Sequence, residues 1–579
     1  MTVYLGFSCS QHDPSIAVVS EAGEVLFAEA NERALKYKRG WHATPDPFGV
    51  IEPILAAYVG EQPVSASLTW SRPALRSTGT LAALSRVGLR AVELLRPRHL
   101  EAELARGWAF RHGLYRAPPS ANEMLLNLEL RLKEVRGFST SIKKRAWNHH
   151  LCHAVTACYS SPFAEALCVV VDGMGEGTST SVYSFQDGRL KRLDPPRLPS
   201  LASLGIYYSQ ICFAAGFDPM AGEEWKLMGL AAYGTLDREL HQLLRSALRV
   251  KNLRFVQTRA YASVLDRLAA YRGRAPQANA DLAFTAQQVF EELLYEFLEQ
   301  AHRRWGAENL ILTGGCALNS SANGKILSSG PFKRLHVPMA PGDDGNSVGA
   351  ALLDWQAAHP IERVPRFSSP YLGSSIADEA MARLSAFGVS PDFVARDVED
   401  LASRVADELA AGAVAGWVQG RAEFGPRALG GRSILADPRP HGIRDRLNAS
   451  IKRREEFRPF APSILHEHGP DYFEDYTYSP YMERTLRWRP GKAPSGVCHV
   501  DGTGRLQSVT RDVNPAFHAV LAAFHRKTGL PILLNTSFNV MGRPMVHDIE
   551  DAIGVFMTSD LDLLVLQNMV FRKPRRPNV

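Results

Sequence analysis

Residues 309–326 read NLILTGGCALNSSANGKI, an apolar run of strand type that meets a glycine pair and continues into a polar, helix-like segment. Two other stretches also place glycines and carboxylates directly after apolar residues: ALCVVVDGMGEG at 166–177 and VPMAPGDDGNSVGAALLDWQ at 337–356. Strands that run into Gly-rich turns and then helices, in both halves of a region, indicate an α/β core with a nucleotide at the loop ends. The first prediction is therefore an α/β fold.

The segments around this core predict further elements. The first forty residues predict a hairpin, because TVYLGFSC (2–9), IAVVS (16–20) and VLFAEAN (25–31) are strand-like and are separated by turn residues. Residues 73–146 are rich in Arg, Leu, Ala and Glu at helical spacing, which predicts a helical insertion with solvated basic faces. A long helix is expected over residues 281–305.

The length of 579 residues exceeds what one hydrophobic core supports, and two to four domains are expected. The Pro-rich stretch HPIERVPRFSSPYLG, residues 359–373, is the best linker candidate. We predict one domain over residues 1–360, which includes the insertion, and a second α/β domain over residues 374–579.

Composition indicates an ordinary globular protein of a reducing cytosol. The chain is 45% hydrophobic and 22% charged, and no apolar run approaches the roughly 18 residues that a membrane span needs. The first residues, MTVYLGFSC, lack the basic and apolar regions of a secretory signal. Seven cysteines without a CxxC pair argue for buried thiols rather than a disulfide framework or a zinc ribbon. We therefore expect a cytoplasmic protein with no membrane partner.

The net charge of +6 and a pI near 8.9 mildly favour anionic ligands such as nucleotides and phosphates. The charge falls short of the concentrated basic face of a nucleic-acid binder, so no nucleic-acid partner is expected.

A metal site is predicted from two histidines and two aspartates. His149 and His153 are four residues apart, so a helix would project both imidazoles from one face toward one ion. Asp172 ends an apolar strand and Asp343 lies in a glycine loop before a helix, places from which a carboxylate can point into a cleft. Two nitrogens with carboxylates suit Fe(II), Mn or Zn, whereas Mg alone prefers an all-oxygen shell. The alternative is a satisfied structural histidine pair.

Several motifs together resemble the NodU/CmcH family of O-carbamoyltransferases. In the first half the motifs are HHLCHA, VVDGMGEG, WKLMGLAAYG, TGGCALNSSANGKI and PGDDG. In the second half they are GWVQGRAEFGPRALGGRSILADPR, REEFRPFAPSIL, HVDGTGRLQSV and LLNTSFNVMGRPMV. The resemblance implies an actin-like ATPase domain (Kae1-like, with a duplicated RNase H-like fold, similar to TsaD) followed by a YrdC-like α/β domain.

The resemblance also implies roles for single residues. His149, His153, Asp172 and Asp343 match the family's metal ligands, with His150 as a neighbour and Asp344 left as an alternative to Asp343. His12 matches the family's HDxxA loop near the acyl-transfer centre. Lys38 falls where the family has a basic residue near the nucleotide, although the surrounding residues depart from the family pattern.

The C-terminal half supplies cations for the phosphate of carbamoyl phosphate, the donor that the resemblance implies. Arg427, Arg458 and Arg505 lie in apolar, Pro- or Gly-bearing motifs, where an unpaired charge would be costly. The guanidinium fork matches phosphate oxygens and stays charged, so these arginines are predicted to bind the donor and to act in catalysis. Arg432 is left open between support of the site and pairing with an acid; surface salt bridges are the alternative for all four.

Two strand ends complete the predicted site. Asn535, Ser537 and Asn539 follow an apolar strand, which suits a polar ligand held at a sheet edge, or else a capped turn. The resemblance implies that this ligand is carbamoyl phosphate. Gly314, Gly315 and Asn319 follow another strand and are predicted to bind the nucleotide, because glycines present N–H groups to phosphate.

The reaction implied by the resemblance has two stages. The second domain would use carbamoyl phosphate and Mg-ATP to form carbamoyl-adenylate and pyrophosphate, and the first domain would pass the carbamoyl group to a hydroxyl of a small-molecule acceptor. The divalent metal is expected to be Fe(II), with Mn or Zn as alternatives, and a homodimer is a reasonable assembly. The competing hypotheses are a threonylcarbamoyl-type tRNA-modifying enzyme and a non-carbamoylating ATPase of the actin-like group.

Overall fold

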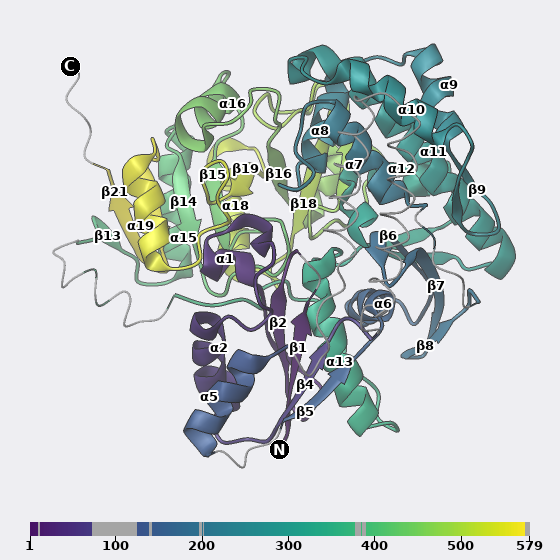
Figure 1. Cartoon of the computed structure of the whole chain (residues 1–579). Coiled ribbons are helices and arrows are strands. Elements are labelled where there is room, and N and C mark those ends of the chain that lie inside the picture. Colours follow the sequence, from purple (N-terminus) through teal and green to yellow (C-terminus); the bar gives the residue numbers. More distant parts are fainter. Residues whose placement is uncertain are drawn as a thin grey trace. The chain divides into compact units, whose positions relative to one another are not determined.

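The computed structural model of the chain describes residues 1–9, 12–71, 124–137, 142–195, 200, 202–376, 382, 384 and 390–573 (Figure 1). Two compact units are present. The first comprises Met1–Glu32, Arg39–Val155 and Asp343–Pro365; the second comprises Arg33–Lys38, Thr156–Gly342 and Arg366–Val579. The domain boundary predicted at residues 360–374 stays a prediction.

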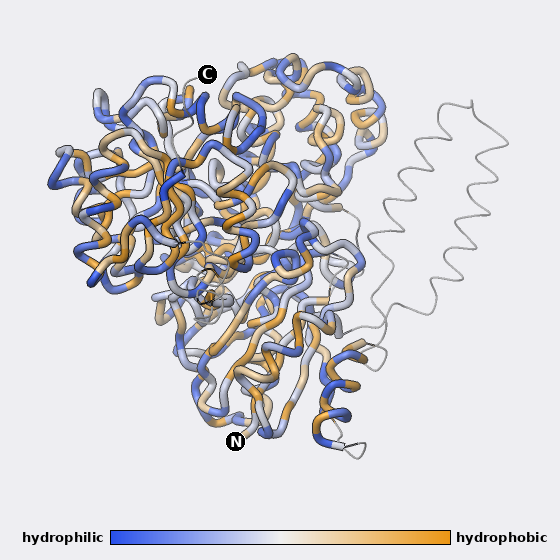
Figure 2. The backbone as a smooth tube through the Cα atoms, turned by 90° about the vertical axis from the view of Figure 1, so that its left-hand side faces the viewer, coloured by the Kyte–Doolittle hydropathy of each residue, from blue (hydrophilic) through white to orange (hydrophobic). Residues whose placement is uncertain are grey.

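The first unit is built on a five-stranded sheet of order β3-β2-β1-β4-β5. Strands β1, β2 and β3 pair antiparallel, as the predicted hairpin requires, and β4 and β5 continue the sheet in parallel. The strands are β1 Val3–Ser8, β2 Ser15–Val19, β3 Val25–Ala30, β4 Val64–Leu68 and β5 Lys143–Ala146. Figure 2 shows the strands next to the N-terminus largely in its hydrophobic colour.

Successive residues of β1 point to opposite faces of the sheet, and helices pack against both faces. Val3, Leu5 and Phe7 belong to a core shared with α2 (Phe48–Ile54) and α5 (Leu126–Arg136). On β1, Gly6 lies against α13 (Asn346–Ala358): a Cβ at Gly6 would lie 1.9 Å from the carbonyl oxygen of Ser347. Glycine therefore sets the close approach of α13, and with it the position of the loop before this helix.

The second unit contains a sheet with the same topology. Its order is β12-β11-β6-β7-β8, in which β6, β7 and β8 pair antiparallel and β11 and β12 follow in parallel. The bounds are β6 Glu165–Gly175, β7 Thr178–Gln186, β8 Arg189–Arg192, β11 Asn309–Thr313 and β12 Arg334–His336. Two sheets with one strand order are the duplication that the predicted actin-like fold requires.

Helices and a small two-stranded sheet share one hydrophobic core with one face of this second sheet. The predicted long helix is confirmed as α11, Ala280–Trp305, which ends at Gly306 in a left-handed conformation with φ +68°. The other elements are α7 Leu204–Ala214, α8 Glu224–Leu230, α9 Arg238–Ala247, β9 Leu248–Val250, β10 Phe255–Gln257, α10 Tyr261–Leu268 and α12 Ser320–Ser329.

The C-terminal part of the second unit is a nine-stranded mixed sheet of order β13-β21-β20-β14-β15-β19-β16-β18-β17. Its strands are β13 Phe393–Val394, β14 Ala415–Val418, β15 Arg432–Ala436, β16 Ala461–Leu465, β17 Arg484–Arg487, β18 Thr503–Val509, β19 Ile532–Ser537, β20 Leu563–Leu566 and β21 Met569–Arg572. One face packs on α15 (Val398–Ala410) and α18 (Pro515–Thr528) and the other on a core that includes α19 (Ile549–Thr558). Together with the sheets above, it confirms the α/β class.

The predicted insertion over residues 73–146 lies mostly outside the described residues. Within them, helix α5 confirms the helical character near residue 130, but the end of the segment is strand β5, which pairs with β4. The strand was missed because Lys143, Lys144 and Arg145 have no strand-like alternation, and pairing with β4 overrides their local preference.

The described cysteines are all free, and none of the described helices is long and apolar enough to cross a membrane.

Candidate active site

Helix α6, His149–Tyr159, places two of the predicted metal ligands on one face. His149 and His153 are separated by one turn, and their Nε2 atoms lie 3.2 Å apart. Both side chains are buried. The predicted histidine pair is therefore formed in the first unit.

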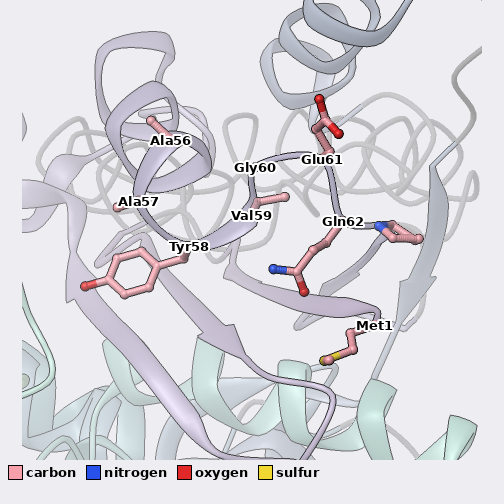
Figure 3. Close-up of a pocket in the computed structure, with 9 residues that line it drawn as sticks. Met1, Ala56, Ala57, Tyr58, Val59, Gly60, Glu61 and Gln62 are labelled. Atoms are coloured by element: carbon pink, nitrogen blue, oxygen red, sulfur yellow. The ribbon is translucent and has the colours of Figure 1, made fainter.

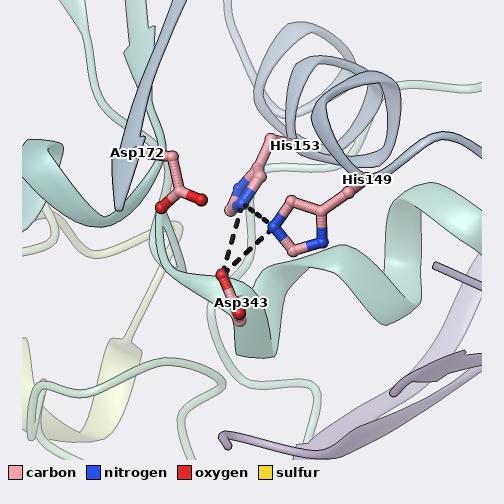
Figure 4. Close-up of side chains that lie close together, drawn as sticks. All are labelled: His149, His153, Asp172 and Asp343. Atoms are coloured by element: carbon pink, nitrogen blue, oxygen red, sulfur yellow. Dashed lines mark hydrogen bonds and ion pairs between the residues drawn. The ribbon is translucent and has the colours of Figure 1, made fainter. Parts of the chain in front are cut away.

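Asp343 completes a group of three donors within the same unit. It begins the short helix η7 (Asp343–Gly345) ahead of α13, and its Oδ1 lies 3.4 Å from His149 Nε2 and 3.5 Å from His153 Nε2 (Figure 4). Burial raises the pKa of Asp343, but the neighbouring histidines outweigh it and hold that pKa well below its usual range.

The spacing of these donors fits one metal ion. An ion bound tetrahedrally at 2.0–2.2 Å separates its ligand atoms by about 3.3–3.6 Å, and the three measured separations are 3.2, 3.4 and 3.5 Å. Two imidazole nitrogens and a carboxylate oxygen are also a donor set that Fe(II), Mn and Zn accept.

Asp172, the fourth predicted ligand, belongs to the second unit. It lies in β6 where the pairing with β7 becomes irregular, and its Oδ1 accepts a hydrogen bond of 2.9 Å from the Gly315 N–H. Its place among the metal ligands stays a prediction. Asp344, the alternative to Asp343, is absent from the three-donor group, and burial together with Asp13 and Glu32 raises its pKa to about 7.

His12 lies beside the metal donors of the first unit. Its Nδ1 is 2.8 Å from Asp13 Oδ2 and 3.8 Å from Asp343 Oδ2. Asp13 is also hydrogen-bonded by Arg39 through Nε (3.2 Å) and Nη2 (3.0 Å). The basic residue near His12 is therefore Arg39, a position that the sequence left unassigned.

Lys38, the predicted nucleotide ligand, lies in the second unit. Its Nζ is 5.8 Å from the ring centroid of Trp225 in α8. The guanidinium carbon of Arg458 stacks over the same ring, 3.9 Å from its centroid. The nucleotide role of Lys38 stays a prediction.

Four guanidinium groups of the second unit influence one another electrostatically, and we call them the arginine cluster: Arg427, Arg454, Arg458 and Arg505. Burial and the other three members lower the pKa of Arg505 well below its usual range, and burial lowers the pKa values of Arg427 and Arg458 to about 10. The Nε atom of Arg505 is buried and has no hydrogen-bond partner among the described residues.

Few acids compensate these charges. Glu455 lies 3.4 Å from Arg458 but also pairs with Lys226 at 2.6 Å, and Lys226 is shared with Glu223. Buried positive charges without matching carboxylates are costly unless an anion binds them. The cluster is thus a candidate anion site, and the surface salt bridges considered from the sequence do not describe these arginines.

Two members of this region were missed by the sequence analysis. Arg454 donates from Nε to Asn448 Oδ1 at 2.7 Å and stacks on Phe460 at 4.4 Å. Lys452 is buried and donates to Ser537 O at 2.7 Å and Asn539 O at 2.9 Å; burial first, and then Arg454, lowers its pKa. Lys452 precedes the motif REEFRPFAPSIL, and Arg454 is its first residue. Their closeness to this motif in the sequence was the signal that could have identified them.

Arg432 was left open between support of the site and pairing with an acid, and its guanidinium donates to backbone carbonyls. The side chain is fully buried in β15, and its guanidinium donates to the backbone carbonyls of Gln419, Gly420, Gly431 and Ser374 at 2.9–3.1 Å. Arg432 therefore holds the loops around FGPRALG in place.

The predicted polar side chains at the end of β19 form some of their hydrogen bonds within the protein. Asn535 is buried and donates to Ser463 Oγ and Gln507 Oε1, whereas its Oδ1 has no hydrogen-bond partner among the described residues. Ser537 Oγ donates to Asn539 Oδ1 at 2.8 Å and accepts from Lys452. These hydrogen bonds connect Ser537 and Asn539 to Lys452. The role of Asn535 and Ser537 in binding carbamoyl phosphate stays a prediction.

The residues of the predicted nucleotide loop after β11 have structural roles. Gly314 has φ +92°, and a Cβ there would lie 2.4 Å from the carbonyl oxygen of Val171. The Asn319 side chain accepts from Ala322 N–H at the start of α12 and exchanges hydrogen bonds with Gln287. Nucleotide binding by these residues and Gly315 remains a prediction.

A separate surface pocket of the first unit is lined by Met1 and residues 56–63 (Figure 3). It contains none of the predicted site residues, and we assign it no function.

Family models match both halves of the chain. Residues 120–352 match the carbamoyltransferase N-terminus and residues 406–573 match the carbamoyltransferase C-terminus. The chain is 39% identical over 438 residues to nodulation protein NolO of Bradyrhizobium diazoefficiens, which covers 74% of this chain and 79% of that protein. It is 32% identical to nodulation protein U of Sinorhizobium fredii, covering 74% of this chain and 78% of the relative.

Two solved structures show weak similarity to this chain. Component A of Acidaminococcus fermentans (R)-2-hydroxyglutaryl-CoA dehydratase is 11% identical with a TM-score of 0.33, over 62% of this chain and 100% of that one. HypF from T. kodakarensis is 14% identical with a TM-score of 0.32, over 62% and 48%. The matches to both family models and the 39% identity to NolO show that the chain belongs to the carbamoyltransferase family.

Proposed function

We propose that the protein is an ATP-dependent O-carbamoyltransferase that uses carbamoyl phosphate as its donor. Carbamoyl phosphate and water give carbamate and phosphate; the carbamate oxygen then attacks the α-phosphorus of ATP, giving carbamoyl-adenylate and pyrophosphate. An acceptor hydroxyl next attacks the carbamoyl carbon, and AMP leaves with the bonding electrons while the hydroxyl proton passes to a base. The acceptor in this proposal is a small molecule such as a sugar or another natural product.

The observation that carries the proposal is the arginine cluster. Carbamoyl phosphate is a dianion and Mg-ATP is also anionic, and four buried guanidinium groups with a shortage of acids supply the countercharge. Family membership makes carbamoyl transfer the reaction class, and the cluster favours a phosphorylated donor.

In the first unit, His149, His153 and Asp343 would hold a divalent metal, with Asp172 proposed as the fourth ligand. When bound, the metal would act as a Lewis acid on phosphate or carbonyl oxygen. We propose Fe(II), with Mn and Zn as alternatives.

His12 is proposed as the base. Its Nδ1 lies 2.8 Å from Asp13 Oδ2 and 2.9 Å from Arg39 Nη2, so a carboxylate and a guanidinium both contact the imidazole that takes the acceptor's hydroxyl proton.

Pyrophosphate release tests the first stage. Purified protein containing its metal is incubated with Mg-ATP, with and without carbamoyl phosphate and without an acceptor, and the nucleotide products are examined by mass spectrometry. We expect release that depends on carbamoyl phosphate, together with a carbamoyl-adenylate peak. If both are absent under these conditions and in the presence of a panel of hydroxyl acceptors, the proposed reaction is wrong.

A further inference from the structure

His499 has a hydrogen-bonding arrangement that the proposed reaction does not yet use. It lies in the loop just before β18, where its backbone N–H donates to Thr503 O at 2.8 Å and its carbonyl accepts from the Gly502 N–H at 3.0 Å. The imidazole Nε2 is buried and has no hydrogen-bond partner among the described residues. A buried polar atom of this kind normally has a partner, either protein or ligand.

A short relay decides which ring nitrogen carries the proton. Thr503 Oγ1 lies 2.6 Å from Asp501 Oδ1, and the carboxylate can only accept, so the hydroxyl hydrogen goes to Asp501. The same Oγ1 is 3.2 Å from His499 Nδ1. Because the hydroxyl hydrogen is already used, Nδ1 must donate, and Nε2 is left with its lone pair. His499 is thus held as a neutral ring whose buried nitrogen can only accept.

The environment keeps this ring neutral. Burial, with a contribution from Arg505, lowers the pKa of His499 to about 4, against the opposing effect of Asp501. Thr503 and Arg505 are two residues apart on β18, so their side chains leave the same face of the strand. The acceptor nitrogen therefore belongs to the region of Arg505, the member of the arginine cluster whose buried Nε has no hydrogen-bond partner among the described residues.

The arginine cluster and His499 complement each other chemically. Guanidinium groups donate hydrogen bonds to phosphate oxygens and cannot recognise a donor group on the ligand. A ligand donor placed beside four guanidinium groups must itself be neutral, since an ammonium would be repelled. The carbamoyl –NH₂ of carbamoyl phosphate is such a neutral donor, and acetyl phosphate carries a methyl group in its place.

We propose that His499 Nε2 accepts a hydrogen bond from the carbamoyl –NH₂ and so selects carbamoyl phosphate over other acyl phosphates. This inference rests on the proposed function, because it assumes that the arginine cluster binds carbamoyl phosphate. Asp501 and Thr503 are positioning residues that fix the tautomer of His499.

Binding of two probes without turnover tests the proposal. Dissociation constants for carbamoyl phosphate and acetyl phosphate are measured by calorimetry on the full-length protein in the absence of ATP. We expect the wild type to prefer carbamoyl phosphate by about tenfold or more, the value of one hydrogen bond to an otherwise unsatisfied buried group.

Two substitutions separate recognition from support of the fold. His499→Asn keeps an N–H near Thr503 but has no acceptor at the position of Nε2, so the preference should fall to nearly onefold while acetyl phosphate binds as before. His499→Gln, whose amide oxygen reaches that position, should retain part of the preference. His441→Asn, at an exposed histidine, is the matched control and should change neither constant.

The outcomes that overturn the proposal are distinct. If His499→Asn weakens both probes equally, or changes neither, His499 only supports the loop. If the wild type prefers carbamoyl phosphate and His499→Asn keeps that preference, this inference alone fails. If the wild type binds neither probe, the proposed function fails with it.

Discussion

The metal donors of the first unit and the arginine cluster of the second are built from opposite chemistry. His149, His153 and Asp343 offer lone pairs that converge to within 3.5 Å, and the two histidines stabilise the ionised carboxylate. The arginine cluster offers only N–H donors and positive charge, and each charge raises the cost of the others. One group is suited to a cation and the other to an anion, so a loss in one should leave the ligand of the other in place.

The largest effect is expected from His153→Ala. Removing one of three convergent donors should abolish metal binding and carbamoyl transfer, while pyrophosphate release that depends on carbamoyl phosphate persists. Metal content per chain, measured by mass spectrometry, and pyrophosphate release are the two readouts. His441→Ala, at an exposed histidine, should retain the metal. Normal metal content in His153→Ala would remove the metal assignment.

Arg458→Ala tests the other side of the comparison. Loss of a buried charge contact should weaken carbamoyl phosphate by about 2–5 kcal/mol, which corresponds to about 30- to 4,000-fold, with metal content unchanged. The carbamoyl phosphate concentration that gives half-maximal pyrophosphate release measures it, and Arg526→Ala on the exposed side of α18 is the control. An unchanged concentration would reduce Arg458 to a structural role.

His336, which belongs to neither site, should make the folding stability depend on pH. Burial, followed by Arg484, lowers the pKa of His336 to about 3, and its Nε2 contacts Ser160 Oγ at 3.2 Å. The unfolded chain takes up this proton first, near the ordinary histidine pKa of about 6.5, so folding stability falls as pH drops below that value. His336 should contribute a loss of about 1.4 kcal/mol per pH unit down to about pH 3.

Urea unfolding at pH 8.0 and pH 5.5 measures this contribution. His336→Gln cannot take up the proton, so it should lose about 1.4 kcal/mol less than the wild type between the two values. Equal losses in both proteins would show that His336 is not buried in its neutral form.

The smallest effect is expected at Trp225, which supports the arginine cluster from α8. Arg458 stacks on its ring at 3.9 Å. Trp225→Leu should therefore weaken carbamoyl phosphate by about 1 kcal/mol, or about fivefold, and Trp225→Phe by less. The same pyrophosphate assay measures both, and equal effects of Leu and Phe would argue against a cation–π contribution.

Local sequence patterns predicted the histidine pair and several elements of the fold. The histidine pair follows from a spacing of four residues on a helix, and the N-terminal hairpin and α11 follow from periodicity and turn residues. Strand β5 was not predicted, because its charged residues form a strand only through pairing with β4. Most of the segment over residues 73–146 lies outside the described residues, so its helical character there stays a prediction.

The carbamoyltransferase class, the histidine pair and three arginines of the cluster were predicted from the sequence, because motif residues and short helical spacings are local properties. The tertiary structure was needed to show that Arg454 belongs to the arginine cluster, that Lys452 is influenced by it, that Arg39 lies at His12, and that Arg432 binds backbone carbonyls. The physical reason is that the charge around a side chain depends on segments distant in the chain. Lys226 and Glu455, which are 229 residues apart yet form a 2.6 Å ion pair, illustrate this dependence.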